Sequence, residues 1–137
     1  MEILRATRTA QQAAAYYVRI QAMARKHRIP LDAEFDEHDT PQTNYIVIMD
    51  DFLPVATCRL YGLDQQHVML GRIVVLPEYR HRGLGTLVVK RQIRAYLLSV
   101  KRLPATGWRK ICKREAVLVE VKLLSPKTES RKPIASV

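Results

Sequence analysis

The sequence predicts an α+β fold, in which helices pack against a mostly antiparallel sheet. Three strand-like segments follow one another between residues 45 and 76 with short connections, which favours antiparallel neighbours. Apolar residues recur at helical spacing both before and after these strands. The resulting order is strand, helix, loop, three strands, helix, which differs from the strict strand–helix alternation of a parallel sheet.

The first elements are a strand, a helix and an acidic segment. Glu2–Ala6 is a short strand candidate, and Thr9 is expected to cap a helix that runs to about Lys26. Pro30 interrupts the helical pattern. Residues 31–39 (LDAEFDEHD) carry five carboxylates and no helical stripe. They are therefore predicted to form an ordered loop or a short helical turn.

The three central strands are predicted from β-branched and aromatic residues. Tyr45–Met49 and Pro54–Tyr61 flank a turn at Asp50–Asp51 and are interpreted as a hairpin. His67–Leu76 is the third strand, and Gly71 is expected at a bulge, because glycine inside a strand often marks one.

The chain then divides into a patterned part and an irregular part. Gly83 to about Val100 has helical spacing, and it closes a domain predicted to span residues 1–100. Residues 101–137 are predicted to be an atypical, partly disordered tail with one strand candidate, Ala116–Leu124.

The positive charge is concentrated in the tail. The net charge of +10 would fit a nucleic-acid-binding protein. Residues 1–90 hold 11 Lys+Arg against 10 Asp+Glu, whereas residues 91–137 hold 12 against 3. One hypothesis is therefore that residues 101–132 bind nucleic acid, with Trp108 stacking on a base beside Arg109 and Lys110. The preferred alternative is a solvated basic tail, which disfavours a nucleic-acid partner.

Several other classes are disfavoured by composition. No apolar stretch reaches the roughly 18 residues of a membrane-spanning helix, and the N-terminus lacks the long apolar segment of a secretory signal. We therefore expect a cytoplasmic protein. Cys58 and Cys112 are expected to be reduced thiols. No spacing of ligand residues predicts a metal site.

The stretch VVLPEYRHRGLGTLVVK, residues 74–90, has the pattern of an anion site. A strand ends, a glycine loop follows, and a helix begins with N–H groups that lack helical partners. Gly83 and Gly85 let phosphate oxygens approach the backbone, and Arg80 and Arg82 add charge. The spacing fits neither a P-loop nor a dinucleotide fingerprint. It predicts a pyrophosphate site in preference to a simple helix cap.

The spacing Arg80-x-x-Gly83-x-Gly85 after a buried strand resembles the signature of the GNAT superfamily of N-acetyltransferases. Residues 17–61 are also similar to the front half of a bacterial GNAT subfamily, although this chain has Met23 and Lys26 where relatives often have Phe and Glu. The matching positions are Arg19, Ile29-Pro30, residues 34–39 and Pro54-Val55-Ala56.

This resemblance implies an acetyl-CoA-dependent transfer to an unidentified amine by direct attack. The backbone of the strand before the loop would pair with the pantetheine arm, and an N–H near the bulge would polarise the thioester carbonyl. A carboxylate usually serves as the base, which makes Glu34, Asp36 and Glu37 weak candidates; a solvated acidic loop is the alternative. The implied residues for acetyl-CoA are Ile73, Val74, Val75, Arg80, His81, Arg82, Gly83, Leu84, Gly85 and Thr86.

The tail departs from the family pattern. Relatives continue with a strand and a Phe-Tyr-x-Lys-x-Gly segment whose tyrosine is often the general acid, but no tyrosine follows Tyr96 here. The C-terminal strand and helix are thus predicted to be incomplete or altered. One hypothesis is a frameshift, because shifting Val117–Leu124 by one base permits a similar segment. Independent divergence or a short natural variant is the alternative. With part of the cleft wall replaced, the chain would bind coenzyme A weakly, acetylate slowly, or be a coenzyme-A-binding remnant without turnover. A missing final strand would expose a sheet edge, which leaves a homodimer open.

Overall fold

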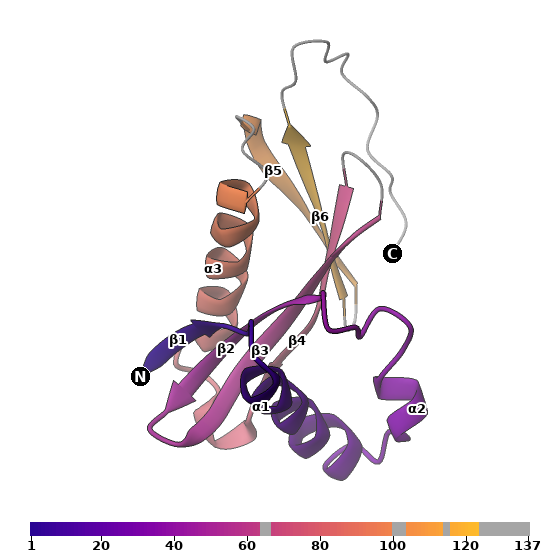
Figure 1. Cartoon of the computed structure of the whole chain (residues 1–137), viewed down its shortest axis with the longest axis vertical. Helices are drawn as coiled ribbons and strands as arrows, with labels where there is room; N and C mark the ends of the chain where they lie inside the picture. Colours follow the sequence, from indigo (N-terminus) through magenta and orange to yellow (C-terminus); the bar gives the residue numbers. More distant parts are fainter. Residues whose placement is uncertain (64–66, 100–103, 114–115, 124–137) are drawn as a thin grey trace.

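The computed structural model describes residues 1–63, 67–99, 104–113 and 116–123, with side chains described as far as Ser99. The elements follow the order shown in Figure 1. They are β1 (Glu2–Arg5), α1 (Thr9–Arg19), the π-helical segment η1 (Ile20–Arg25), α2 (Leu31–Glu34), β2 (Asn44–Asp50), β3 (Leu53–Gly62), β4 (His67–Val75), the 3₁₀ turn η2 (Pro77–Tyr79), α3 (Leu84–Ser99), β5 (Pro104–Lys113) and β6 (Ala116–Leu123).

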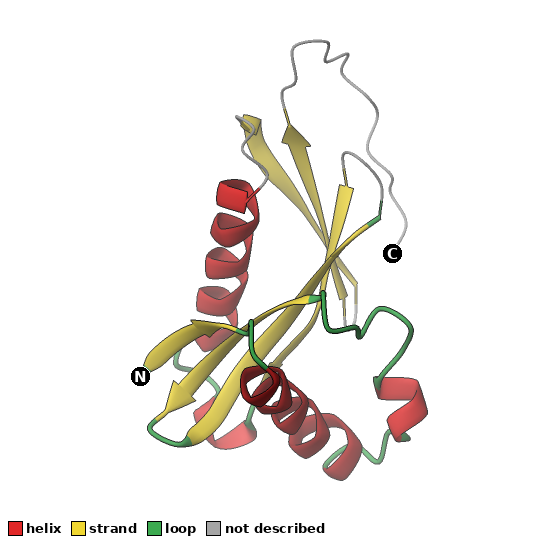
Figure 2. Cartoon of the chain, viewed as in Figure 1, coloured by secondary structure: helices red, strands yellow, loops and turns green. Residues whose placement is uncertain are grey.

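The strands form one sheet in the order β1-β2-β3-β4-β6-β5, and every neighbouring pair is antiparallel. The helices lie against this sheet (Figure 2). The predicted α+β class is therefore confirmed.

The core lies on both faces of the sheet because β2 is buried on both sides. Tyr45 and Val47 pack with Ala15 of α1. Ile46 and Ile48, which alternate with them, belong to the larger cluster that includes α3. Its α3 members are Leu84, Val88, Val89 and Ile93. Strand alternation thus explains why one helix covers each face.

The first helix begins at Thr9, the residue predicted as its cap, and so one residue earlier than expected. Thr9 is the first helical residue, and Arg8 takes the cap position. The side-chain oxygen of Gln11 accepts hydrogen bonds from the backbone N–H groups of Thr7 and Arg8, at 3.0 and 3.1 Å. The expected extent to about Lys26 is confirmed, but the last turns, η1, are π-helical.

A bulge divides β4 into two parts. Thr57 of β3 pairs with Val74, but Arg59 pairs with Gly71, so that Arg72 and Ile73 together face a single residue of β3. The bulge therefore follows Gly71, one position later than predicted, and Arg72 adopts a positive φ of 47°. Pairing of β4 with β6 also stops at Gly71. Among the described strands, none pairs with that side of Arg72–Val75.

The structure places two strands after residue 100 where the sequence predicted one. Ala116–Leu123 matches the predicted strand, whereas Pro104–Lys113 was not expected. This segment contains Pro, Gly and three charged residues, which are depleted in strands, so only its pairing with β6 reveals it. The predicted disorder near the C-terminus falls on residues 124–137, which lie outside the described residues.

Candidate active site

The loop between β4 and α3 has the backbone that an anion site needs. After η2, His81 and Gly83 have positive φ values of 65° and 76°. The first turn of α3 closes when the N–H of Leu87 donates to the carbonyl of Gly83, at 3.0 Å. The preceding N–H groups of α3, at Leu84, Gly85 and Thr86, therefore have no intrahelical acceptor and carry the positive end of the helix dipole.

The arginines of this loop are exposed and held by weak contacts. Arg80 donates from Nε to the carbonyl of Val75, and Arg82 donates from Nη2 to the carbonyl of Glu78, both at 3.3 Å. The Arg82 guanidinium also lies 4.9 Å from the centre of the Tyr79 ring. Both guanidiniums can therefore reorient towards an anion at little cost.

The loop adjoins the hairpin between β2 and β3 through one strong contact. The hydroxyl of Tyr79 donates to Oδ2 of Asp50 at 2.6 Å. This hydrogen bond raises the pKa of Tyr79 above its ordinary value. Asp50 of the hairpin thus helps to stabilise the conformation of the loop.

The sequence-predicted cofactor residues form one continuous path. Ile73, Val74 and Val75 lie on the part of β4 that has no β6 partner, and Leu76 and η2 connect it to the glycine loop. Leu84 is buried in the core, so that only its backbone faces the loop. The other members, from Arg80 to Thr86, are exposed or half-buried.

A pocket of about 490 Å³ opens beside the bulge. It lies between the end of the first helical stretch, α2 and β4. Its walls are formed by Met23, His27, Ile29, Glu34, Arg72, Ile73 and Val74. Because Ile73 and Val74 also belong to the part of β4 without a β6 partner, this pocket adjoins the predicted pantetheine path.

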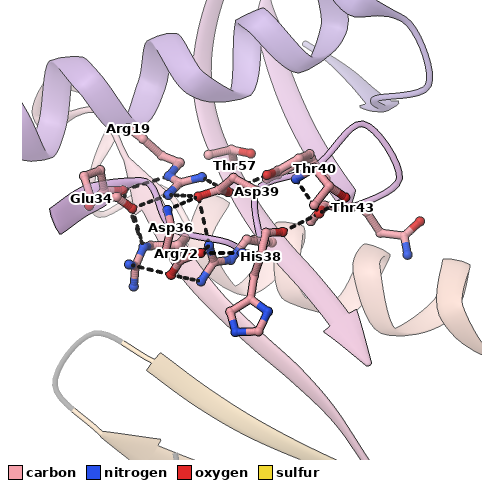
Figure 3. Close-up of polar contacts among 12 residues, drawn as sticks. Arg19, Glu34, Asp36, His38, Asp39, Thr40, Thr43, Thr57 and Arg72 are labelled. Carbon is pink, nitrogen blue, oxygen red and sulfur yellow. Dashed lines mark hydrogen bonds and ion pairs between the residues drawn. The ribbon is translucent and has the colours of Figure 1, made fainter. Parts of the chain in front are cut away.

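The acidic segment forms a buried ion-pair cluster with arginines (Figure 3). Arg19 of α1 is fully buried. It donates to a carboxylate oxygen of Glu34 at 2.7 Å and to one of Asp39 at 2.6 Å. Its guanidinium also lies 4.3 Å from the centre of the Phe35 ring. A fixed charge at this depth requires such partners.

Two further arginines complete the cluster from the sheet. Arg59 of β3 donates to Asp36 at 2.8 Å and to Asp39 at 3.1 Å. Arg72, at the bulge, donates to the carbonyl of Glu34 at 3.1 Å and to Asp36 at 3.4 Å. The interpretation of the acidic segment as a solvated loop is therefore wrong for Glu34, Asp36 and Asp39.

The ion pairs alter the acidity of two carboxyls. Burial alone would raise the pKa of Asp36, but hydrogen bonds from Arg59 and the backbone outweigh it and lower the pKa. For Asp39, burial is likewise outweighed by hydrogen bonds from Arg19 and Tyr45. A general base must take up a proton near the working pH. The arrangement therefore disfavours Asp36 in that role, and Glu34 has its oxygen committed to Arg19.

Glu37 differs from the other candidate bases. Its side chain is 82% exposed, and within the described residues its ion-pair partner is His38, 3.5 Å away. The solvated interpretation holds for this residue. It lies outside the residues that line the pocket beside the bulge.

Sequence reasoning missed Arg59 and Arg72 as members of the cluster. A signal was present in PVATCRLY, because a single charged residue inside an otherwise apolar strand needs a buried partner. No sequence signal indicated which acidic residue that partner would be.

The cluster predicts a loss of stability in acid. Asp36 and Asp39 have folded-state pKa values below the unfolded value of about 3.9, so the unfolded chain binds more protons at low pH. Their contribution is present above about pH 5 and is lost as the pH falls below about 4. Urea unfolding across this range should show the free energy of unfolding decreasing most steeply below about pH 4.

Asp39→Asn is the matched variant for this measurement. It should be less stable than the wild type at neutral pH and should show a shallower decrease in acid, because one titrating group is gone. An unchanged slope would contradict the assignment of the acid sensitivity to this cluster.

The remaining predictions concern membrane-spanning helices, the two cysteines and the basic tail. No helix in the described part of the chain is long and apolar enough to span a bilayer. Cys58 is a free, buried thiol whose pKa is raised by burial, while the side chain of Cys112 lies outside the described residues. Trp108, Arg109 and Lys110, named for nucleic-acid binding, lie in β5, and their side chains are also outside the described part.

Comparisons with known proteins identify the family. Residues 6–100 match the model of the Acetyltransferase (GNAT) family. The uncharacterized N-acetyltransferase YjcF of Bacillus subtilis (strain 168) is 30% identical over 76 residues, which are 56% of this chain and 53% of YjcF. The chain therefore spans about half the length of this curated relative.

Solved structures share the fold. A Lactobacillus plantarum protein assigned as an N-acetyltransferase superposes with a TM-score of 0.68 at 24% identity, covering 90% of this chain and 98% of its own. The ribosomal-protein-S18-alanine N-acetyltransferase of Escherichia coli gives 0.59 at 16% identity, with 96% and 98% covered. Escherichia coli ElaA gives 0.61 at 14%, with 88% and 99% covered.

Proposed function

The chain belongs to the acetyltransferase (GNAT) family, and from this premise we propose that it transfers an acetyl group from acetyl-CoA to an amine. The observation that carries this proposal is that the part of β4 without a β6 partner leads through η2 into the glycine loop at the start of α3. Family membership supplies the reaction class. The geometry of β4, the glycine loop and the start of α3 supports the assignment of each part of the coenzyme.

The pyrophosphate would bind at the start of α3. The N–H groups of Leu84, Gly85 and Thr86 lack helical acceptors and would donate to phosphate oxygens. Arg80 and Arg82 would exchange their 3.3 Å contacts with backbone carbonyls for charge-assisted hydrogen bonds. Gly83, at a φ of 76°, makes the turn that aims these groups.

The pantetheine arm would take the place of a missing strand. Val74 pairs with Thr57 of β3 on one side, and its other side has no described strand partner. Amide groups of the arm can therefore pair with Ile73–Val75 in the manner of β-augmentation. The thioester would then lie close to the bulge, where a backbone N–H can polarise its carbonyl.

The acceptor amine would enter through the pocket beside the bulge. Its neutral nitrogen attacks the thioester carbonyl carbon, the C–N bond forms, and the C–S bond breaks to release coenzyme A as a thiol. The proton leaves the amine to a base. Glu37 is the candidate that no arginine contacts in the described cluster, and because it lies outside the pocket lining it would receive the proton through a water. The pocket is about 490 Å³, which suits a small amine or the end of a longer one.

Calorimetric titration distinguishes this proposal from its rivals. Acetyl-CoA should bind, whereas S-acetylpantetheine, which lacks the pyrophosphate, should bind at least about 100-fold more weakly, because it cannot use the loop. Equal affinity for both would contradict the pyrophosphate site. A subsequent screen of amines should release coenzyme A thiol. Binding without release by any amine would indicate a coenzyme-binding remnant.

A further inference from the structure

The hairpin between β2 and β3 ends in an exposed aromatic residue. Phe52 has 98% of its surface accessible, and Asp51 beside it is also exposed, with a φ of 52°. We name these two residues the hairpin tip. A fully exposed Phe beside a carboxylate contributes nothing to the core. Aromatic residues are enriched in protein–protein interfaces, so the tip has the composition of an anchor.

A second pocket, of about 760 Å³, lies next to this tip. It is bounded by the first helical stretch on one side and by η2 on the other. We name it the basic pocket, because Arg25 and Lys26 line its rim, with Glu78 as the one acidic member of the lining. Its remaining walls are Tyr17, Gln21, Leu53, Leu76, Pro77 and Tyr79.

The hairpin tip and the basic pocket are complementary in apolar character and in charge. The pocket offers aliphatic and aromatic walls for a Phe side chain, and Tyr17 and Leu53 are 38% and 37% exposed there. Lys26 and Arg25 offer cations for the carboxylate of Asp51. Asp50, the other acidic residue of the turn, already accepts from Tyr79 and so helps to shape the pocket.

The two features are neighbours on one surface. Leu53 lines the basic pocket and directly follows Phe52 in the chain. The tip of one chain therefore projects beside its own pocket without filling it. A two-fold axis beside Leu53 would let each tip enter the pocket of the opposite chain, which is the reciprocal arrangement of an isologous interface.

We infer that the basic pocket is occupied by the hairpin tip of a second copy of this chain. A partner other than this chain would have to complement only the hairpin tip or only the basic pocket, and would leave the match between the two unexplained. Their complementarity on the same chain is what a two-fold pair requires, and it does not involve the sheet edges at β1 and β5.

Analytical ultracentrifugation of the full chain tests this inference. The wild type should associate to twice the mass of one chain, and Phe52→Ala should weaken the association by about 10-fold or more. Leu98→Ala is the matched control, since Leu98 is 72% exposed on α3 and lies outside the pocket. It should associate like the wild type. A monomeric wild type, or equal loss in both variants, would overturn the inference.

A charge exchange makes the test independent of folding. Asp51→Lys alone and Lys26→Glu alone should each weaken self-association, because like charges then meet. An equimolar mixture of the two variants should restore it, because each mixed pair has two opposite-charge contacts. A mixture that stays monomeric would contradict the two-fold arrangement.

Acetyl-CoA titration of Phe52→Ala separates a competing occupant. The variant should keep the affinity of the wild type, since Phe52 lies outside the proposed coenzyme path. Loss of acetyl-CoA affinity without any change in mass would instead assign the tip to the adenine ring and overturn the inference.

Discussion

Gly85→Glu is expected to raise the dissociation constant for acetyl-CoA by about 100-fold or more, equivalent to about 2.7 kcal/mol. The reason is electrostatic. A carboxylate in the first turn of α3 would occupy the positive end of the helix dipole and would repel the pyrophosphate. The fold should survive, because a Cβ at Gly85 meets only Val75 Cγ2, at an ordinary 3.8 Å. Calorimetric titration with acetyl-CoA provides the measurement.

The matched control carries the same change at another glycine. Gly62, at the exposed end of β3, has no neighbour within 4 Å of an added Cβ. Gly62→Glu should therefore bind acetyl-CoA like the wild type. If both variants lose affinity equally, then net charge and not the glycine loop determines binding. If Gly85→Glu binds like the wild type, the coenzyme does not use the loop.

Arg19→Met is expected to lower the free energy of unfolding by about 3–5 kcal/mol. Arg19 is fully buried, and its removal leaves the carboxylates of Glu34 and Asp39 with fewer partners at 3% and 5% side-chain exposure. An uncompensated buried charge costs more than the methionine side chain recovers by packing. Urea unfolding at neutral pH measures this loss.

Two comparisons define the origin of that loss. Arg91→Met, at an exposed position of α3, should change stability by less than about 0.5 kcal/mol. Asp39→Asn should cost less in the Arg19→Met background than in the wild type, because the pair is already broken. Additive effects would show that the two residues do not stabilise the fold as a pair.

The strands of the sheet could be predicted because their signal is local. Tyr45–Met49 is rich in β-branched residues and its first four residues are buried, so a continuous apolar run identifies it. Pro104–Lys113 was not predicted, since its Pro, Gly and three charged residues interrupt any strand pattern and its pairing is with β6. The bulge was placed one residue early because Arg72, and not glycine, has the positive φ.

The glycine loop and the ion-pair cluster likewise differ in how far the sequence predicts them. The glycine loop lies within seven consecutive residues, so spacing alone could indicate it. The ion-pair cluster joins residues from α1, the acidic segment, β3 and β4. Only the folded chain brings Arg19, Arg59 and Arg72 to the same carboxylates, and charge composition alone suggested a solvated loop.

The contact between Arg80 and the Val75 carbonyl couples the binding of the pyrophosphate to that of the pantetheine arm. In the free chain the Arg80 guanidinium donates to the Val75 carbonyl, an acceptor that the pantetheine arm would need. Engagement of a phosphate by Arg80 would vacate that carbonyl, so the two ends of one ligand become cooperative through a single side chain. A pantetheine fragment and a phosphate-containing fragment should then each bind more weakly alone than as parts of one coenzyme. When the phosphates of the product leave Arg80, its pantetheine arm should dissociate as well.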